Sequence, residues 1–291
     1  MLRGLLVRSF TFENCLVLIA TLLSVLILTF AGPTAFAANS CKSVFQRVDG
    51  ARVDGRYGRA SQRDPELGAQ GLISARGSQL CGPTCLFNGL EKFRHQETVE
   101  AQKANPALGR SGGSKPSAGQ QIGDLVRNFF PRSSIVDRGA RIETLADAFR
   151  KAMRAERFSG DVTAYSAVES EANIKRGLDP WHLVKSVDDN TVVVAKFGEY
   201  RETNLDYVSE SNRVRGHYMI VAGYDPANPR NFYFIDPNAP RQLRVARLEG
   251  KYLPAYKDEV IIAKFYDVAG VETGTVIIDG LVVAQRSTVN H

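Results

Sequence analysis

Two neighbouring stretches decide which kind of sheet this chain builds: residues 217–224, HYMIVAGY, and residues 231–237, NFYFIDP. Both are rich in aromatic and aliphatic side chains, and residues 225–230 between them contain two prolines and an asparagine. Apolar runs separated by turn-forming residues are typical of antiparallel strands joined by a turn. We therefore predict a β-hairpin here, within an antiparallel sheet.

The predicted hairpin brings a histidine close to an aspartate. We take Tyr224 to pair with Asn231 across the turn. His217 then lies opposite Asn238, two residues beyond Asp236. His217 and Asp236 become diagonal neighbours on one face, with Cβ atoms within roughly 7–8 Å, whereas a slip of one residue would place them on opposite faces. A carboxylate in this position can orient an imidazole ring and stabilise its charged form.

Residues 78–86, which precede the hairpin in the chain, read SQLCGPTCL and place a cysteine just before a predicted helix. Proline is favoured in the first turn of a helix, so Gly82-Pro83 predicts a helix start with Cys81 just before it. The positive end of the helix dipole favours a thiolate, which is the nucleophilic form of cysteine. Free backbone N–H groups at the same place can receive an oxyanion during acyl transfer. Cys81 is therefore the predicted nucleophile.

These segments together resemble the C39-like, papain-fold cysteine peptidases. Residues 81–86 look like that family's nucleophile helix, residues 216–225 like its Gly-His-aromatic strand, and residues 234–237 like its closing Asp-Pro. The resemblance implies a triad of Cys81 as nucleophile, His217 as base and Asp236 as orienter, hydrolysing an amide without a metal or other cofactor. It also implies an α+β, papain-like fold, in which a helical half with the nucleophile helix packs on an antiparallel β-sheet.

The oxyanion residue and the nucleophile each have an alternative. The family places a glutamine upstream of the nucleophile, but Ala75 stands six residues before Cys81. Gln79 and the more distant Gln70 are the candidates, and Gln79 is the one we carry forward. Because Gln79 lies six residues before Cys85, the spacing of the papain branch, Cys85 is the alternative nucleophile. We prefer Cys81, since a thiol one turn inside a helix more often packs as a small apolar side chain.

The N-terminus has the order of a signal peptide for export. A basic start is followed by the uncharged apolar run 16–30 and by the small-residue signal Ala35-Phe36-Ala37. The run is shorter than a membrane span needs, so we predict cleavage of residues 1–37 and an extracytoplasmic protein, secreted or periplasmic, which stays membrane-anchored if the signal is not cleaved. Cleavage leaves Cys41, Cys81 and Cys85. An odd number of cysteines implies a free thiol, and one hypothesis pairs Cys41 with Cys85.

The mature chain divides into an irregular N-terminal extension, 38–70, and a papain-like catalytic domain, 71–291, whose residues 241–291 extend the sheet. Hydrophobic periodicity and turn residues set the predicted elements within it. Helices are predicted over 85–104, 120–129 and 142–157, and strands over 191–197, 216–224, 231–235, 242–248, 259–265 and 274–283. Asp279-Gly280 is a hairpin turn signal inside the last of these.

The net charge of +6 is carried by scattered basic residues, without the interleaved aromatics of a nucleic-acid surface. The expected partner is a peptide or protein substrate, with no nucleic acid. We expect an exported thiol hydrolase, foremost a cysteine peptidase acting through an acyl-enzyme on Cys81. The alternatives are an amidase or an acyl or peptidyl transferase acting on envelope material, and a non-enzymatic binding scaffold.

Overall fold

The computed structural model of the chain describes residues 56–73, 79–104, 115–131, 135, 139–167, 179–200, 213–225, 227–253, 258–267 and 269–287. They all belong to one compact unit, residues 45–291. The predicted signal peptide and Cys41 lie outside the described residues, as does the first part of the predicted extension 38–70. The elements in chain order are α3 (Pro65–Ala69), α4 (Cys81–Ala104), α5 (Ala118–Phe129), α7 (Ile142–Ala155), β1 (Gly160–Ser166), α8 (Pro180–Lys185), β2 (Thr191–Tyr200), β3 (Arg213–Tyr224), β4 (Asn231–Ile235), β5 (Leu243–Leu253), β6 (Asp258–Tyr266) and β7 (Glu272–Arg286).

The strands form a sheet that closes on itself. Its order is β1-β7-β2-β3-β4-β5-β6, and β6 pairs in addition with β7. Every pair is antiparallel. The six strands from β7 to β6 therefore make a closed antiparallel barrel, and β1 is an extra strand on the outside of β7. Closure leaves these six strands with pairing partners on both sides, which removes the exposed edges of an open sheet.

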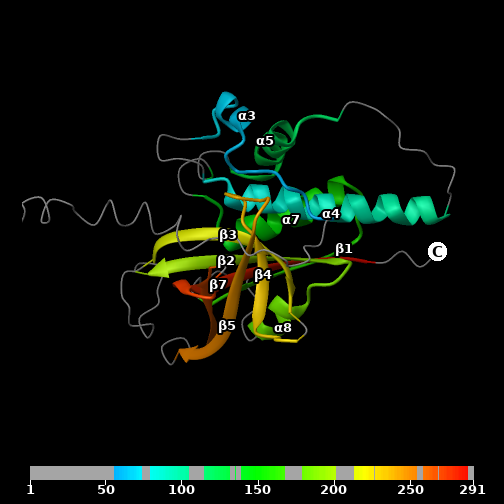
Figure 1. Ribbon diagram of the computed structural model, residues 1–291. Coiled ribbons are helices and arrows are strands. Elements are labelled where there is room, and N and C mark those ends of the chain that lie inside the picture. The colour runs from blue at the N-terminus through cyan, green and yellow to red at the C-terminus, as the bar shows by residue number, and fades with distance from the viewer. Residues whose placement is uncertain are drawn as a thin grey trace, which may run out of the picture. The chain divides into compact units, whose positions relative to one another are not determined.

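The predicted fold class is wrong. The sequence led us to expect a papain-like helical half packed on a sheet, whereas the structure is a β-rich closed barrel with few helices (Figure 1). The expectation came from the resemblance of three short segments, which do not determine whether the sheet closes, and closure depends on β7. We had predicted a hairpin turn at Asp279-Gly280, but β7 runs through these residues as one strand of 15 residues. A strand of that length pairs with β6 along its first half and with β1 and β2 along its second, and so closes the sheet.

Gly280 serves close packing instead of a turn. A Cβ atom at this position would lie 3.1 Å from the Ile142 Cδ1 atom of α7 and 3.2 Å from the Tyr165 carbonyl oxygen of β1. Both contacts are tighter than Cβ atoms normally make, so a larger residue would require the Ile142 side chain or the β1 backbone to shift by a few tenths of an ångström. The glycine that resembles half of a turn signal in the sequence is needed because two other elements approach β7 closely there.

The longest of the described helices, α4, lies over β3 and β2 and packs against both (Figure 1). It begins at Cys81, four residues before the start predicted from hydrophobic periodicity. Leu86, Leu90 and Phe93 recur at helical spacing along it and are fully buried. Among the residues that the structure describes, no helix is long and apolar enough to cross a membrane.

Three aromatic rings fill the interior of the barrel. Phe197 of β2, Phe234 of β4 and Phe265 of β6 contact one another, with ring centroids 5.3–6.0 Å apart. No two of these strands are neighbours in the ring of strands. Their rings therefore meet across the inside of the barrel, and they make an apolar floor for any polar group on the same face of the sheet.

Candidate active site

The hairpin of β3 and β4 brings His217 and Asp236 into direct contact. His217 Nε2 lies 2.8 Å from Asp236 Oδ1. Ile220 pairs with Ile235 and Val221 with Phe234, which is the register that the sequence predicts for this part of the hairpin.

At the turn, however, the predicted pairing of Tyr224 with Asn231 is wrong, because Tyr224 pairs with Phe232. A bulge between Val221 and Gly223 absorbs the difference of one residue. The register error at the turn therefore does not reach the site.

The thiol of Cys81 is the second partner of the same imidazole. Cys81 is the first residue of α4, and its side chain lies close enough to His217 to help raise the pKa of the imidazole. The first backbone hydrogen bond of the helix runs from the Thr84 N–H group to the Leu80 carbonyl oxygen. The N–H groups of Cys81 and Gly82 precede it, so they have no partner within the helix. The imidazole thus lies between a thiol at a helix N-terminus and a buried carboxylate.

The charges of this site support one another. Burial is the largest effect on His217 and lowers its pKa, but the charge and hydrogen bond of Asp236, together with Cys81, outweigh it and raise the pKa to about 10. For Asp236, burial raises the pKa, and the positive charge and hydrogen bond of His217 lead the effects that lower it overall. The stable state of the pair at neutral pH is therefore imidazolium with carboxylate.

The turn after β4 is fixed by an upstream segment of the chain. The Asn238 N–H group donates to Asp236 Oδ1 at 2.8 Å, and Asn238 Nδ2 lies 3.4 Å from His217 Nε2. Gln62 donates from its backbone to the Pro237 carbonyl oxygen at 3.0 Å and from its side chain to Asn238 Oδ1. Arg63 Nε also donates to Asn238 Oδ1, at 3.2 Å. Because arginine can only donate, this contact fixes which end of the amide faces the imidazole.

Sequence reasoning missed the supporting role of Gln62 and Asn238. Asn238 could have been found, since the predicted register already placed it opposite His217. Gln62 carries no comparable signal. It lies in the stretch interpreted as an irregular extension, where the structure has the short helix α3 and several contacts to the turn at residues 236–240.

Cys85, the alternative nucleophile, lies one turn further along α4 and is fully buried. Burial is the main cause that raises the pKa of its thiol well above the ordinary value, and the charges of Cys81 and Asp236 add to it. Cys85 is therefore held as a neutral thiol. Both described cysteines are free, so the structure contains no bridge between Cys81 and Cys85 and leaves Cys85 unpaired with any described cysteine.

The two glutamines considered for the oxyanion occupy different surroundings. Gln70 donates to the Gly119 carbonyl oxygen and accepts from Arg127, so its amide is used in holding α3 against α5. Gln79 is half-buried directly before α4, beside Gly139. Within the described ranges its amide makes no hydrogen bond. Of the two, Gln79 is the one that lies near Cys81, the predicted nucleophile, along the chain.

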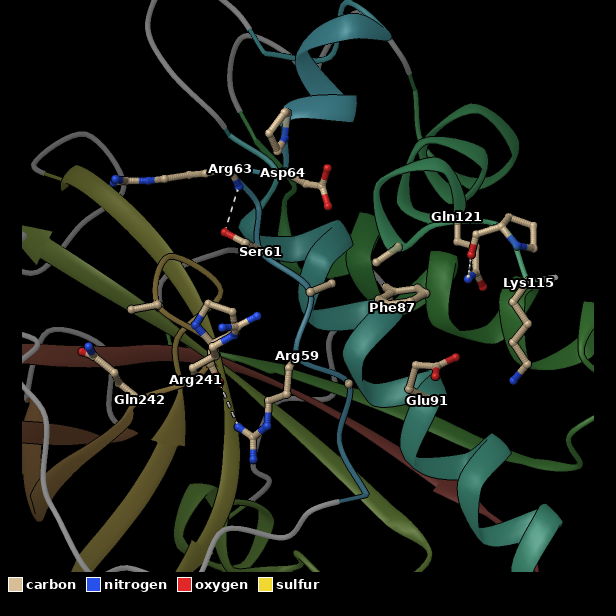
Figure 2. A pocket seen from close by; sticks show the side chains of 17 residues that line it. Arg59, Ser61, Arg63, Asp64, Phe87, Glu91, Lys115, Gln121, Arg241 and Gln242 are labelled. Carbon is tan, nitrogen blue, oxygen red and sulfur yellow. Dashed lines mark hydrogen bonds between the residues drawn. The ribbon is translucent and has the colours of Figure 1, made fainter. Parts of the chain in front are cut away.

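A pocket of about 690 Å³ lies beside the site and is lined by residues of the 58–65 segment, α4, residues 115–121 and residues 239–242. Cys81, His217 and Asp236 do not line it. In Figure 2 the Arg63 side chain points to the left, whereas that of Lys115 lies at the right and points downward. The two cations therefore do not converge on one point. Two lining residues reach the turn after β4, since Ser61 donates to the Pro237 carbonyl oxygen and Arg63 to Asn238 Oδ1. We therefore base the chemistry on the triad and not on this pocket.

No protein-family model matches the chain, and the search of curated proteins gave no match either. In the part of the chain that the structure describes, no group of three or more His, Cys, Asp or Glu side chains is arranged to hold a metal ion. The assignment of a function therefore rests on the geometry of Cys81, His217 and Asp236.

Proposed function

We propose that this protein is an exported thiol hydrolase, foremost a cysteine peptidase, with Cys81 as nucleophile. The single observation that supports the proposal is the position of the His217 imidazole between the Cys81 thiol and the buried Asp236 carboxylate, 2.8 Å from the latter. A nucleophile, a base and an orienting group within hydrogen-bond reach of one another are the recurrent arrangement of covalent acyl transfer.

The reaction would run in two steps. The Cys81 sulfur attacks the carbonyl carbon of the substrate amide, the C–S bond forms, and the carbonyl oxygen becomes an oxyanion at the start of α4. The C–N bond then breaks, and the His217 imidazolium gives its proton to the leaving amine. In the second step a water molecule loses a proton to His217 and attacks the thioester carbon, which releases the acid and restores the thiolate. Gln79 is the proposed further donor to the oxyanion.

Alkylation of the purified protein by iodoacetamide from pH 4 to 9, mapped by mass spectrometry, tests the proposal. A thiolate held by an imidazolium reacts well below the usual thiol range of about pH 8–9. We expect Cys81 to react rapidly near pH 5–6, and to do so in the His217→Ala variant only at the ordinary thiol pH. His95→Ala is the matched control, because His95 is exposed on α4, and it should leave the profile unchanged.

Each other outcome has a definite meaning. If Cys85 reacts at low pH instead, the triad remains but its nucleophile moves by one helical turn. If neither cysteine reacts below about pH 8, the proposed enzyme is refuted and the binding scaffold takes its place. If the trapped acyl-enzyme reacts faster with added amines than with water, the protein is a transferase instead of a hydrolase.

A further inference from the structure

A buried arginine stands behind the triad. Arg244 Nε on β5 lies 3.7 Å from Asp236 Oδ2, the carboxylate oxygen that does not face His217. The side chain of Arg244 is 7% exposed and that of Asp236 is 1% exposed. Opposite charges this close and this shielded from water interact strongly, because little solvent screens them.

The sheet register explains how Arg244 reaches the site. Arg244 pairs with Phe234 of β4, so the two side chains share a face of the sheet. That face is the barrel interior, since Phe234 contacts Phe197 and Phe265 there. Asp236 lies two residues beyond Phe234, and His217 pairs directly with Phe197. The arginine and the two polar triad members thus lie on one face above an apolar floor.

The positive charge of Arg244 balances the net charge of the buried triad. When Cys81 is a thiolate and His217 an imidazolium, their charges cancel, and Asp236 leaves one negative charge in a buried site. Arg244 supplies the positive charge that cancels it. An uncompensated buried charge is costly, so the loss of Arg244 destabilises the state with the thiolate relative to the state with the neutral thiol.

We propose that Arg244 is a positioning residue that balances the charge of the triad and so sets the pH range in which the Cys81 thiolate exists. This inference rests on the proposed function of the triad. The pKa shifts agree with it: burial and then the contacts with His217 dominate the pKa of Asp236, and Arg244 contributes to lowering it. Burial lowers the pKa of Arg244 itself to about 10, which leaves the guanidinium charged at neutral pH.

The titratable groups of the site come from β3, from α4 and from the turn after β4. Asp236 follows β4, His217 lies on β3, and Cys81 and Cys85 lie on α4, with Cys85 held neutral by burial. The neighbouring strand β6 pairs its aromatic residues with β5 close to Arg244, and its Lys264 is engaged with Glu249 at 2.9 Å.

The test is the alkylation profile of Cys81 in the full chain carrying Arg244→Met. The acid limb of the profile, where the Cys81 thiol loses its proton, should move to higher pH by about one unit. The alkaline limb, where His217 loses its proton, should move in the same direction. The lost cation disfavours each deprotonation. Alkylation on the acid limb therefore slows by about tenfold at fixed pH. Arg244→Lys should restore the wild-type limbs. Arg247→Met removes a cation from the exposed side of the same strand and should leave them unmoved.

A merely structural role for Arg244 predicts a loss of stability with both limbs unmoved, or no rescue by lysine, and either result overturns the inference. If Arg244→Met does not fold, the comparison is Asp236→Asn against the double variant Asp236→Asn with Arg244→Met. The single variant keeps Arg244 without its carboxylate partner, so the excess positive charge should move the acid limb to lower pH. The double variant should move it back to higher pH. If the acid limbs of the two variants lie at the same pH, Arg244 has no charge-balancing role. A wild-type Cys81 without low-pH reactivity refutes the proposed function itself, which keeps the two failures distinct.

Discussion

At the scale of single residues, His217 carries the largest electrostatic consequence. Its side chain is only 16% exposed and its partner Asp236 only 1%. An imidazolium in such surroundings is stable only because the carboxylate and the thiol accompany it. The same interactions that prepare the proposed chemistry therefore also contribute to the stability of the fold.

The protein should lose stability as the pH rises from about 8.5 to 10, because below about pH 8.5 the unfolded chain keeps on the Cys81 thiol the proton that the folded ion pair keeps on His217. The pKa of His217 is about 10 in the folded state, against an ordinary value of 6.5. A raised folded pKa gives stability that is present at lower pH and is lost as the pH passes through about 10. We expect the unfolding free energy, measured by urea titration, to fall on the order of 1–3 kcal/mol over this range. Asp236→Asn should flatten the dependence, and a wild-type protein equally stable at both pH values contradicts the prediction.

Lys92 of α4 is a second buried charge, and it joins three parts of the chain. It is fully buried and donates to Tyr57 Oη at 3.1 Å and to the carbonyl oxygens of Asp188 and Thr191 at 2.6 and 2.8 Å. The three N–H donors of the ammonium group thus satisfy three buried oxygen acceptors that water would otherwise have to reach.

Lys92→Met should destabilise the protein by about 2–4 kcal/mol, because it leaves buried acceptors without their donor. The measurement is urea unfolding followed by circular dichroism. Lys103→Met, at an exposed position of the same helix, is the control and should change stability by less than about 0.5 kcal/mol. Equal effects of the two substitutions would show that the buried contacts contribute nothing.

At the scale of elements, the docking of α4 on the strands decides where the thiol lies. The helix approaches β2 closely at Gly89, where a Cβ atom would lie 2.8 Å from Val192 Cγ1 and 3.3 Å from Phe149 Cζ. Real Cβ atoms do not come that close to a neighbour. The glycine costs about 1 kcal/mol of helix propensity relative to alanine, and close packing is the reason that explains its presence.

Gly89→Val should therefore destabilise the protein by about 1–3 kcal/mol through overpacking. It should also slow the low-pH alkylation of Cys81, since α4 must move away from β2. Thr98→Ala, on an exposed turn of α4, is the matched control and should be neutral or slightly stabilising. An unchanged melting temperature and alkylation rate in Gly89→Val would mean that the close contact can relax without cost.

At the scale of the whole molecule, the barrel and α4 together bury Cys85 completely. Reagents can reach its thiol only when the structure opens. The exposure of a fully buried thiol therefore reports on unfolding of the core and not on local motion of the site.

Pulse alkylation across a urea titration should separate the two cysteines. Cys81 should react under native conditions, whereas modification of Cys85 should follow the global unfolding transition measured by circular dichroism. The modified sites are identified by mass spectrometry of peptides. Native-state modification of Cys85 at a rate similar to that of Cys81 would contradict the buried position and would restore Cys85 as a candidate nucleophile.

Local pattern was sufficient for much of the site. Gly82-Pro83 indicated a helix that starts near Cys81, and the apolar runs 217–224 and 231–235, separated by turn residues, indicated the hairpin. The pairing of His217 with Asp236 followed from the register of that hairpin. The Asp279-Gly280 pair misled the prediction, because a glycine needed for close packing looks like a glycine needed for a turn.

The sequence by itself therefore determined most of the longer strands and helices, though not β1 or α3, and the neighbourhood of His217 and Asp236, because these depend on periodicity and turn chemistry over short stretches of chain. Only the tertiary structure decided that the sheet closes, that Gln62 supports the turn after β4, and that Arg244 stands behind Asp236. These are contacts between distant segments, and they depend on how β7 pairs with β2 and β6 and on which face each side chain takes once the barrel is closed.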